Sequence, residues 1–264
     1  MEREIWSVDK VRGLFDLSGK VAIVTGGSGA FGQAAAKGLA AFGASVVITS
    51  RRVENLETAA ADIAATGATV LPISCDATDV ASVEAMVQKT VAEFGKVDIL
   101  VSGAGQANRF AAEDFPLDEW QTVMDSLVKG TFISCQAVGK RMIAQGSGKI
   151  ITVGSVRGEL GHPGGYAAYG TAKGAVHLLT RQLSAEWAKY RINVNCIAPC
   201  IFWTPLTQQV LDDPELYKIF MQRIPWGRAA DPQDFIGAAV YLASAASDFV
   251  TGAVLMVDGG STAA

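Results

Sequence analysis

The stretch VAIVTGGSGAFG, residues 21–32, decides the fold of this chain. It begins with a short apolar run rich in β-branched residues, which is typical of a buried strand. Four glycines follow within seven residues, and an alanine-rich segment then runs from residue 33 to 42, with Gly43 placed as a C-cap. A run of good helix formers closed by glycine predicts a helix. The stretch therefore opens the chain with a strand, a glycine-rich turn and a helix.

The same alternation continues along the rest of the chain. Apolar runs predict strands at 46–48, 70–73, 99–101, 149–153, 192–197 and 254–257. Helical patterns occupy 53–65, 79–94, 117–144, 166–190 and 232–242, and we expect the third of these to kink near Gly130. Pro72 keeps its strand away from the fully paired centre. Short apolar strands alternating with helices predict an α/β fold, a doubly wound, Rossmann-like parallel sheet in a single domain.

Length and composition fit one globular α/β domain. The chain has 264 residues, of which 50% are hydrophobic and 18% charged, with a net charge of −4. We expect an N-terminal extension at 1–15 and one domain at 16–264, with a substrate lid around 205–226. No basic stripe indicates nucleic acid, and no apolar run approaches the roughly 20 residues of a membrane span. Without a signal-peptide core at its start, the chain is expected to be cytoplasmic.

The cysteines and histidines do not indicate a metal site. Cys75, Cys135, Cys196 and Cys200 form no CxxC pair, and the chain has only two histidines. A zinc site needs more donors at closer spacing. We therefore predict no metal and four reduced thiols.

The glycine turn is a candidate phosphate-binding site. Glycines at 26, 27, 29 and 32 allow a tight turn and close approach of the backbone to a pyrophosphate. The following helix N-terminus offers unpaired N–H groups and the positive end of its dipole. A tight turn without a ligand is the alternative. The position after the first strand of a βα series favours a dinucleotide.

The residues at the end of the second predicted strand indicate whether NAD or NADP is bound. Many such folds place an acid there for the ribose 2′-hydroxyl of NAD. This chain instead has Ser50, Arg51 and Arg52. Guanidinium groups suit a 2′-phosphate through charge-assisted hydrogen bonds. We therefore predict that NADP is preferred and NAD possible, unless the arginines only form a solvated helix start.

A serine, a tyrosine and a lysine are candidate catalytic residues. Ser155 directly follows the strand at 149–153, and Tyr169 and Lys173 lie four residues apart on a predicted helix. Residues at i and i+4 share one helix face, so the ammonium can lower the tyrosine pKa. A phenol with a lowered pKa exchanges protons with an alcohol or ketone. An ordinary tyrosine–lysine pair is the alternative, and Ser155 is a candidate to hold the substrate oxygen.

Together these motifs resemble the short-chain dehydrogenase/reductase family, from Leu17 to Asp258. The resemblance rests on the glycine loop, Asp76, the segment 100–105, the Ser–Tyr–Lys set and the segments 199–204 and 257–260. It implies hydride transfer between a nicotinamide and a secondary alcohol or ketone. It also implies cofactor contacts from Gly26, Ser28, Gly29, Phe31, Gly32, Ser50, Arg51, Arg52, Asp76, Ala77, Gly103, Ala104, Gly105, Tyr169, Lys173, Pro199, Phe202 and Thr204.

The resemblance assigns roles and shows departures. Tyr169 is implied to be the acid/base, Lys173 to lower its pKa and bind the nicotinamide ribose, and Ser155 to orient the carbonyl. Leu127 stands where the family usually carries an asparagine that holds a relay water. A backbone carbonyl, or Ser126 after a register slip, is left to take that role.

Polar residues cluster where the family binds substrate. We expect substrate contacts from Ser155, Arg157, Gln106, His162 and Trp203. Arg157 can meet a carboxylate or hydroxyls, or pair with Glu159 or solvent. We predict an NAD(P)-dependent oxidoreductase for a polar substrate such as a sugar acid or polyol. The alternatives are a 3-oxoacyl-thioester or broad-range carbonyl reductase, or a non-catalytic dinucleotide-binding subunit. The family also implies a homotetramer through the helices at 117–144 and 166–190 and the strand at 254–257.

Overall fold

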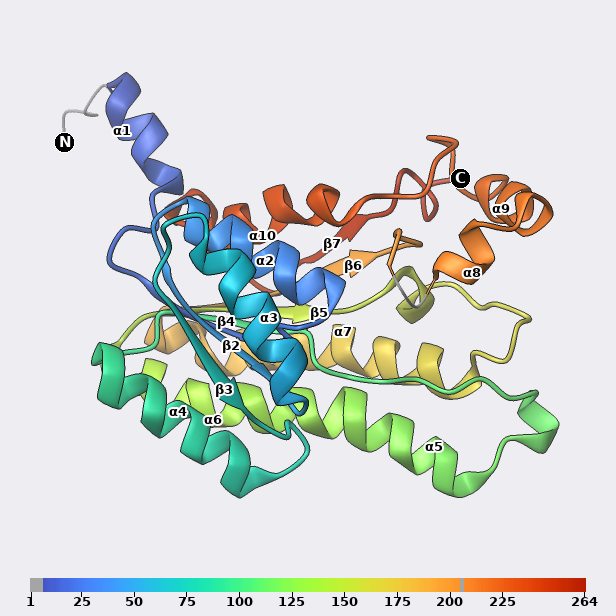
Figure 1. Cartoon of the computed structure of the whole chain (residues 1–264), viewed down its shortest axis with the longest axis horizontal. Coiled ribbons are helices and arrows are strands. Elements are labelled where there is room, and N and C mark those ends of the chain that lie inside the picture. The colour runs from blue at the N-terminus through green and yellow to red at the C-terminus, as the bar shows by residue number, and fades with distance from the viewer. Residues whose placement is uncertain (1–6, 205–206) are drawn as a thin grey trace.

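A single parallel sheet organises the chain, as the sequence predicted. The computed structural model describes residues 7–204 and 207–264. Its sheet has seven strands in the order β3-β2-β1-β4-β5-β6-β7 (Figure 1). The strands are β1 Val21–Thr25, β2 Ser45–Ser50, β3 Val70–Ser74, β4 Ile99–Ser102, β5 Gly148–Val153, β6 Ile192–Pro199 and β7 Val254–Val257.

Helices cover both faces of the sheet (Figure 1). One face carries α2 (Ala30–Ala41), α3 (Val53–Ala64) and α10 (Ile236–Ala243), and the other α4 (Val80–Phe94), α6 (Gly130–Gln145) and α7 (Ala167–Trp187). Strand side chains alternate between these layers. Val24 and Ile48 pack into the first core cluster, whereas Ile23 and Val47 pack into the second. Because both faces are covered, the strands carry apolar core residues on both sides.

The edge position of β3 agrees with its proline. Pro72 is exposed on this outermost strand, where a missing N–H donor costs little. At the centre, β1 pairs with β2 on one side and β4 on the other. The chain order reverses there, so the turns that follow β1 and β4 lie next to each other. Ligands of open α/β sheets bind at such a switch point, outside the carboxyl ends of the strands.

The predicted kink near Gly130 is a π-helical turn. The segment expected as one helix begins as α5 (Leu117–Met124), widens into the π-helix Asp125–Lys129 and continues as α6. Such π-turns interrupt helices at functional sites. Here the turn puts Ser126 at the mouth of the β4 loop, where its hydroxyl accepts the Gln106 N–H at 2.9 Å.

The remaining elements lie at the ends and in the lid region. The short helix α1 (Val8–Arg12) and the 3₁₀ turn Gly13–Phe15 occupy the predicted extension and bury no residue, while residues 1–6 of that extension lie outside the described residues. The expected lid contains α8 (Gln208–Leu211) and α9 (Pro214–Met221), and its residues 205 and 206 lie outside the described ones. In the part that the structure describes, no helix combines the length and apolarity required to cross a membrane.

Candidate active site

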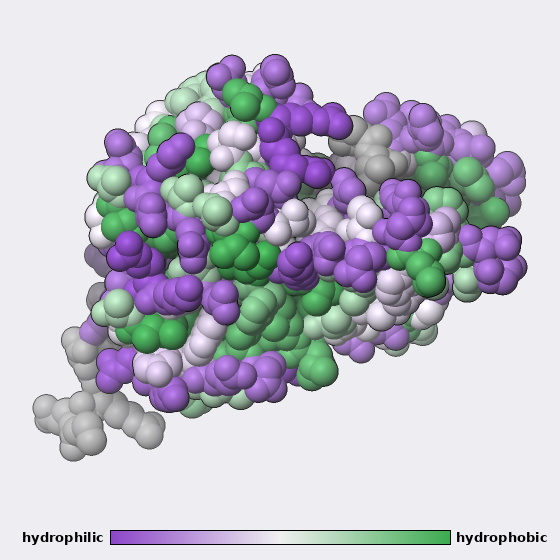
Figure 2. Space-filling view, turned by 90° about the horizontal axis from the view of Figure 1, so that it is seen from below, coloured by the Kyte–Doolittle hydropathy of each residue, from purple (hydrophilic) through white to green (hydrophobic). Residues whose placement is uncertain are grey.

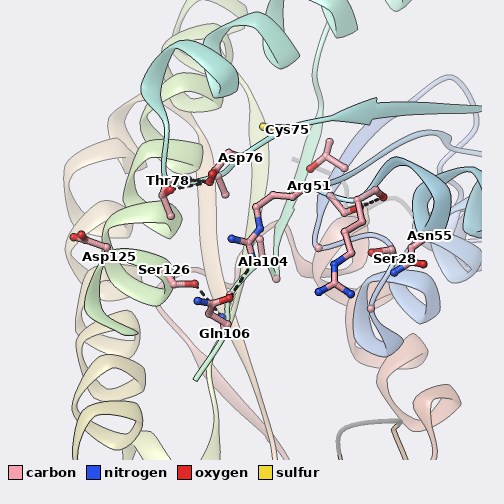
Figure 3. Close-up of a pocket in the computed structure, with 18 of the residues that line it drawn as sticks. Ser28, Arg51, Asn55, Cys75, Asp76, Thr78, Ala104, Gln106, Asp125 and Ser126 are labelled. Atoms are coloured by element: carbon pink, nitrogen blue, oxygen red, sulfur yellow. Dashed lines mark hydrogen bonds between the residues drawn. The ribbon is translucent and has the colours of Figure 1, made fainter. Parts of the chain in front are cut away.

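A groove of about 500 Å³ opens at the carboxyl ends of the central strands (Figure 3). This volume lies in the range of small-molecule sites. The turn after β1, the start of α3, the segment after β3, the β4 loop and the α5 end form its walls. The sequence-predicted residues that line it are Gly26, Ser28, Gly29, Ser50, Arg51, Arg52, Asp76, Ala77, Gly103, Ala104, Gly105 and, from the predicted substrate set, Gln106.

The glycine turn fits the close approach of a pyrophosphate. Gly26 has φ +72°, and a Cβ there would come within 3.0 Å of the Ala104 backbone. A Cβ on Gly32 would lie 2.2 Å from the Gly26 carbonyl oxygen. Gly29 is the N-cap of α2 and supplies no side-chain cap. The helix N-terminus therefore keeps donors for a phosphate, as the sequence indicated.

Two arginines stand at the end of the groove that β2 and the start of α3 form. Arg51 and Arg52 follow β2, and both side chains are exposed. Figure 3 shows Arg51 extended across the groove toward Gln106, and its Nη2 donates to Gln106 Oε1 at 3.0 Å. Asn55, one turn further along α3, also lines this end. The wall is cationic and polar and suits a phosphorylated ribose.

Asp76 lines the groove from the segment that follows β3. Its Oδ1 accepts the Thr78 N–H at 2.9 Å and the Thr78 hydroxyl at 2.7 Å. These two bonds, followed by the nearby Arg51 charge, lower the pKa of Asp76 below its usual range. The carboxylate is therefore ionised at neutral pH, and its Oδ2 keeps acceptor capacity toward the groove.

The structure brings Ser155, Tyr169 and Lys173 together. Ser155 follows β5, and the other two lie on α7, one turn apart. Ser155 and Lys173 are 5% and 8% exposed. The Ser155 hydroxyl lies close enough to the Tyr169 phenol to lower the pKa of that phenol, and the Lys173 ammonium lies 5.7 Å from the centre of the tyrosine ring. A phenol, a hydroxyl and an ammonium thus share one space.

The charge balance at Tyr169 differs from the expected one. Burial raises the pKa of Tyr169, and the nearby Ser155 hydroxyl and the charges of Arg109 and Arg157 act against that rise. Burial lowers the pKa of Lys173 to about 8. The Lys173 Nζ donates to the Val153 carbonyl at 2.6 Å, which directs the ammonium away from the phenol oxygen. In this conformation arginines, rather than the lysine, are the cations that favour the phenolate.

Three arginines from separate segments place their charges around Tyr169, Arg157 and His162. Arg157 follows Ser155, Arg109 comes from the loop after β4, and Arg223 follows α9. The charges of Arg109 and Arg157 act on both Tyr166 and Tyr169, and that of Arg223 acts on Arg157. Arg109 also lies 4.5 Å from the centre of the Tyr166 ring. Within residues 7–204 and 207–264, none of the three arginines forms an ion pair with a carboxylate.

His162 belongs to the same cluster. Its ring contacts Tyr166 edge-on at 4.7 Å and stacks on Phe220 of α9 at 6.2 Å. Its Nδ1 accepts the Gly164 N–H at 3.0 Å. Burial, and after it the charges of Arg157, Arg223 and Arg109, lower the pKa of His162, so the imidazole is neutral at pH 7.

Several predicted residues lie elsewhere. Phe202 is 1% exposed and packs against Phe31 at 4.9 Å in the core, so these side chains face away from the groove. Trp203 stacks on Tyr217 of α9 at 6.2 Å. Gln106 is separated from the arginine cluster and pairs with Arg51 instead. Gly32, Pro199 and Thr204 are not among the groove lining, and Thr204 is hydrogen-bonded to Thr207 at 2.9 Å.

Sequence reasoning missed part of the site. No local motif marks Arg109 or Arg223, although Arg223 falls in the expected lid. Asn55 lies in the first turn of the helix that follows Arg51 and Arg52, and this position could have predicted that it lines the groove. The unpredicted residues lining the groove are Thr49, Asn55, Cys75, Thr78, Thr122, Asp125 and Ser126. In the described part of the chain, no group of three or more histidine, cysteine or acidic side chains is arranged to hold a metal ion.

The fold and the site define a dinucleotide-dependent oxidoreductase, and comparisons with known proteins identify the family. A family model described as enoyl-(acyl carrier protein) reductase matches residues 27–262. The chain is 40% identical over 249 residues to gluconate 5-dehydrogenase of Gluconobacter oxydans (strain 621H), covering 94% of this chain and 97% of that protein. It is 44% identical over 249 residues to 2-dehydro-3-deoxy-D-gluconate 5-dehydrogenase of Dickeya dadantii (strain 3937), covering 93% and 96%.

A solved structure agrees with these relatives. It is described as a gluconate 5-dehydrogenase from Burkholderia cenocepacia J2315 in complex with NADP and tartrate. The TM-score is 0.92 at 39% identity, covering 96% of this chain and 99% of that one. The chain therefore belongs to the short-chain dehydrogenase/reductase family and is an NAD(P)-dependent oxidoreductase, which confirms the family and fold that the sequence predicted.

Proposed function

We propose that this enzyme interconverts a hydroxyl and a keto group on a sugar acid, with NADP as the preferred cofactor. The proposal is carried by Arg109 and Arg157, whose charges act on Tyr169, together with Arg223, whose charge acts on Arg157. Guanidinium groups bind carboxylates by charge-assisted, often bidentate hydrogen bonds. A neutral polyol or an acyl chain has no carboxylate and cannot form them. The relatives named for gluconate, and the relative that holds NADP and tartrate, support the same substrate class.

The groove fits NADP in shape and charge. The glycine turn and the α2 N-terminus would hold the pyrophosphate, since Gly26 and Gly32 allow the tight turn and Gly29 leaves the helix N–H groups without a side-chain cap. Arg51 and Arg52 would bind the 2′-phosphate, and Asp76 would accept from the adenine amino group. When bound, the nicotinamide supplies or accepts the hydride.

The Ser–Tyr–Lys set would handle the proton. Tyr169 would protonate the keto oxygen or deprotonate the hydroxyl, and Ser155 would hold that oxygen through the hydroxyl that now contacts the phenol. Arg109 and Arg157 would hold the substrate carboxylate and favour the phenolate through the same positive charge. Lys173 would bind the nicotinamide ribose once its ammonium turns from the Val153 carbonyl.

A substrate panel tests this proposal. We expect NADPH-dependent reduction of 5-ketogluconate and NADP-dependent oxidation of gluconate, with little turnover of the neutral polyol glucitol. The variant Arg157→Gln should raise KM for gluconate at least tenfold and leave KM for any polyol unchanged. Turnover confined to 3-oxoacyl thioesters or to uncharged ketones would contradict the sugar acid. No turnover with any member of the panel would favour a non-catalytic dinucleotide-binding subunit.

The assembly belongs to the proposal as well. We infer a homotetramer built through the α5–α6 segment, α7 and β7. Figure 2, which shows the molecule from the side of α4, α5 and α6, displays a continuous area of apolar residues between hydrophilic ones. Phe132 of α6 and Leu178 of α7 are 41% and 64% exposed in the single chain. Symmetric assembly buries such faces. A monomer mass in light scattering at micromolar concentration would disprove it.

The proposal extends to the location of the enzyme, to the start of its catalytic domain and to its lid. We expect a cytoplasmic enzyme whose catalytic domain begins at residue 16. The residues from 205 to 226 would act as a substrate lid, because Arg223 and Phe220 bring this segment to the arginine cluster. A variant lacking residues 1–15 should keep its activity, and a loss of folding on this deletion would show that the extension is part of the domain.

A further inference from the structure

A buried histidine lies beneath the turn that carries Ser155. His177 of α7 is 2% exposed, and its Nε2 accepts the backbone N–H of Ser155 at 3.4 Å. On the other side of the ring, Nδ1 lies 3.1 Å from Oε1 of Glu159, four residues beyond that serine. No motif in the sequence marks this histidine. The structure shows it joined to both ends of the segment 155–159.

Two glycines make room for the ring. A Cβ on Gly154 would lie 2.4 Å from the His177 Nε2, and a Cβ on Gly158 would lie 2.5 Å from its Cε1. The backbone on both sides of Ser155 therefore rests directly on the imidazole. Any side chain at either position would force the ring and the turn apart. The position of Ser155 is thus coupled to the position of this ring.

The hydrogen bonds require one protonation state of His177. An N–H donor faces Nε2, so this nitrogen must carry a lone pair. A carboxylate, which only accepts, faces Nδ1, so this nitrogen carries the proton. The ring is therefore neutral with hydrogen on Nδ1. A second proton would set two N–H groups against each other at the serine turn.

The charged and titratable groups around the ring determine whether His177 is neutral or protonated. Glu159 raises the pKa of His177, whereas burial, Arg181 and Lys173 lower it, and the net direction is downward. The Cys196 thiol lies on the β6 side of the ring, next to the same Gly154. Burial raises the pKa of the Cys196 thiol, so the thiol carries no charge at neutral pH. The neutral imidazole is accordingly the form present near pH 7.

We propose that His177 is a positioning residue, which in its neutral form fixes the Ser155 turn and releases it on protonation. The proposal rests on the function inferred above, in which Ser155 holds the substrate oxygen next to Tyr169. The hydroxyl of Ser155 also accepts the Arg157 N–H at 3.1 Å, so the same turn sets the start of the arginine cluster. Protonation of one buried ring would therefore disturb both the reacting oxygen and the carboxylate site.

Turnover as a function of pH tests the role. In wild type, kcat for 5-ketogluconate should fall on the acid side, below the ordinary histidine pKa of about 6.5. His177→Gln keeps an acceptor at similar reach but does not titrate, so it should retain most of the turnover and lose this acid limb. His177→Leu leaves the Ser155 N–H unpaired and should lower kcat about tenfold or more, with unchanged NADPH affinity. Glu159→Gln removes the charge that raises the histidine pKa and should move the limb to lower pH.

The protonation state can be tested without a substrate. The chain has two histidines, so nitrogen NMR on ¹⁵N-histidine-labelled His162→Gln protein reports His177 alone. We expect hydrogen on Nδ1 at pH 7, and slow amide exchange at Ser155 that speeds up when His177 is replaced by Leu. These readouts stand even if sugar acids prove not to be the substrates. Hydrogen on Nε2 at pH 7 would overturn the proposal. So would an acid limb that is unchanged in His177→Gln, or wild-type kcat in folded His177→Leu.

Discussion

The guanidinium of Arg51 donates a hydrogen bond of 3.0 Å to the side-chain oxygen of Gln106 across the cofactor groove. The two residues are 55 positions apart in the chain and follow β2 and β4, the strands that flank β1. Gln106 in turn donates its backbone N–H to Ser126 at the π-turn. A cofactor 2′-phosphate, with its stronger negative charge, would draw Arg51 away from this neutral acceptor.

The first prediction concerns the preference for NADP. Arg51→Ala should weaken NADPH binding much more than NADH binding, because only NADPH carries the phosphate that the guanidinium meets. Gln106→Ala is the matched control: it removes the partner of Arg51 but no positive charge, and should affect both cofactors alike. Titration of each variant with each cofactor measures this. Equal losses of the two cofactors in Arg51→Ala would rule out the assignment.

The second prediction concerns Tyr169. Tyr169→Phe removes only the hydroxyl and keeps the ring that packs against Tyr166 at 5.9 Å. Turnover should fall by about 10²–10⁴, the usual contribution of a general acid or base, while thermal stability and NADPH binding persist. Tyr166→Phe removes a neighbouring phenol whose pKa Ser155 does not influence, and it should lose far less turnover. Near wild-type kcat in Tyr169→Phe would remove the tyrosine from the mechanism.

The third prediction follows from the lowered pKa of Lys173. Its pKa is about 8 in the folded protein, against roughly 10.4 in an unfolded chain. Between these values the unfolded state binds more protons, so this group makes the free energy of unfolding rise with pH. Below pH 8 the buried charge costs the folded state up to about 3 kcal/mol.

Lys173→Met removes that titration, as well as the ammonium proposed for the cofactor ribose. The stability of wild type relative to the variant should therefore be lowest at pH 7 and increase toward pH 10, as measured by urea unfolding. Turnover and NADPH affinity should both fall. Exposed Lys89→Met on α4 is the control, for which the difference should not change with pH. A difference that stays constant between pH 7 and 10 for Lys173→Met would refute the buried-charge account.

The fourth prediction concerns Leu127, which stands in place of the family asparagine. The side chain is 5% exposed in an apolar cluster with Val123, Ala168 and Ala172. We expect its carbonyl, which accepts the Thr131 hydroxyl at 2.7 Å, to be the backbone acceptor of a relay water. Restoring the amide should therefore change turnover little.

Leu127→Asn should also lower the stability by about 1–3 kcal/mol, because it buries an amide among apolar groups. Leu127→Met, which conserves volume, should be close to wild type in both respects. Steady-state kinetics and urea unfolding of the two variants give the comparison. A clear rise in turnover for Leu127→Asn would mean that the missing amide limits proton transfer.

The sequence by itself determined the elements and the local parts of the site. Strands and helices follow from apolar periodicity, and Pro72 marked β3 as an edge strand before the sheet order was known. The glycine turn after β1 and the one-turn spacing of Tyr169 and Lys173 are equally local. Each depends on backbone geometry within a few residues, which the spacing of residue types records directly.

Only the tertiary structure decided how distant segments meet. Arg109, Arg157 and Arg223 come from three loops, and no spacing in the sequence shows that their charges converge. The role of His177 likewise depends on how α7 packs under the turn after β5. Whether Phe202 faces the groove or the core was also settled by packing, because burial of its ring next to Phe31 releases more free energy than exposure. Long-range contacts depend on how loops close and side chains pack together, and neither is written in local periodicity.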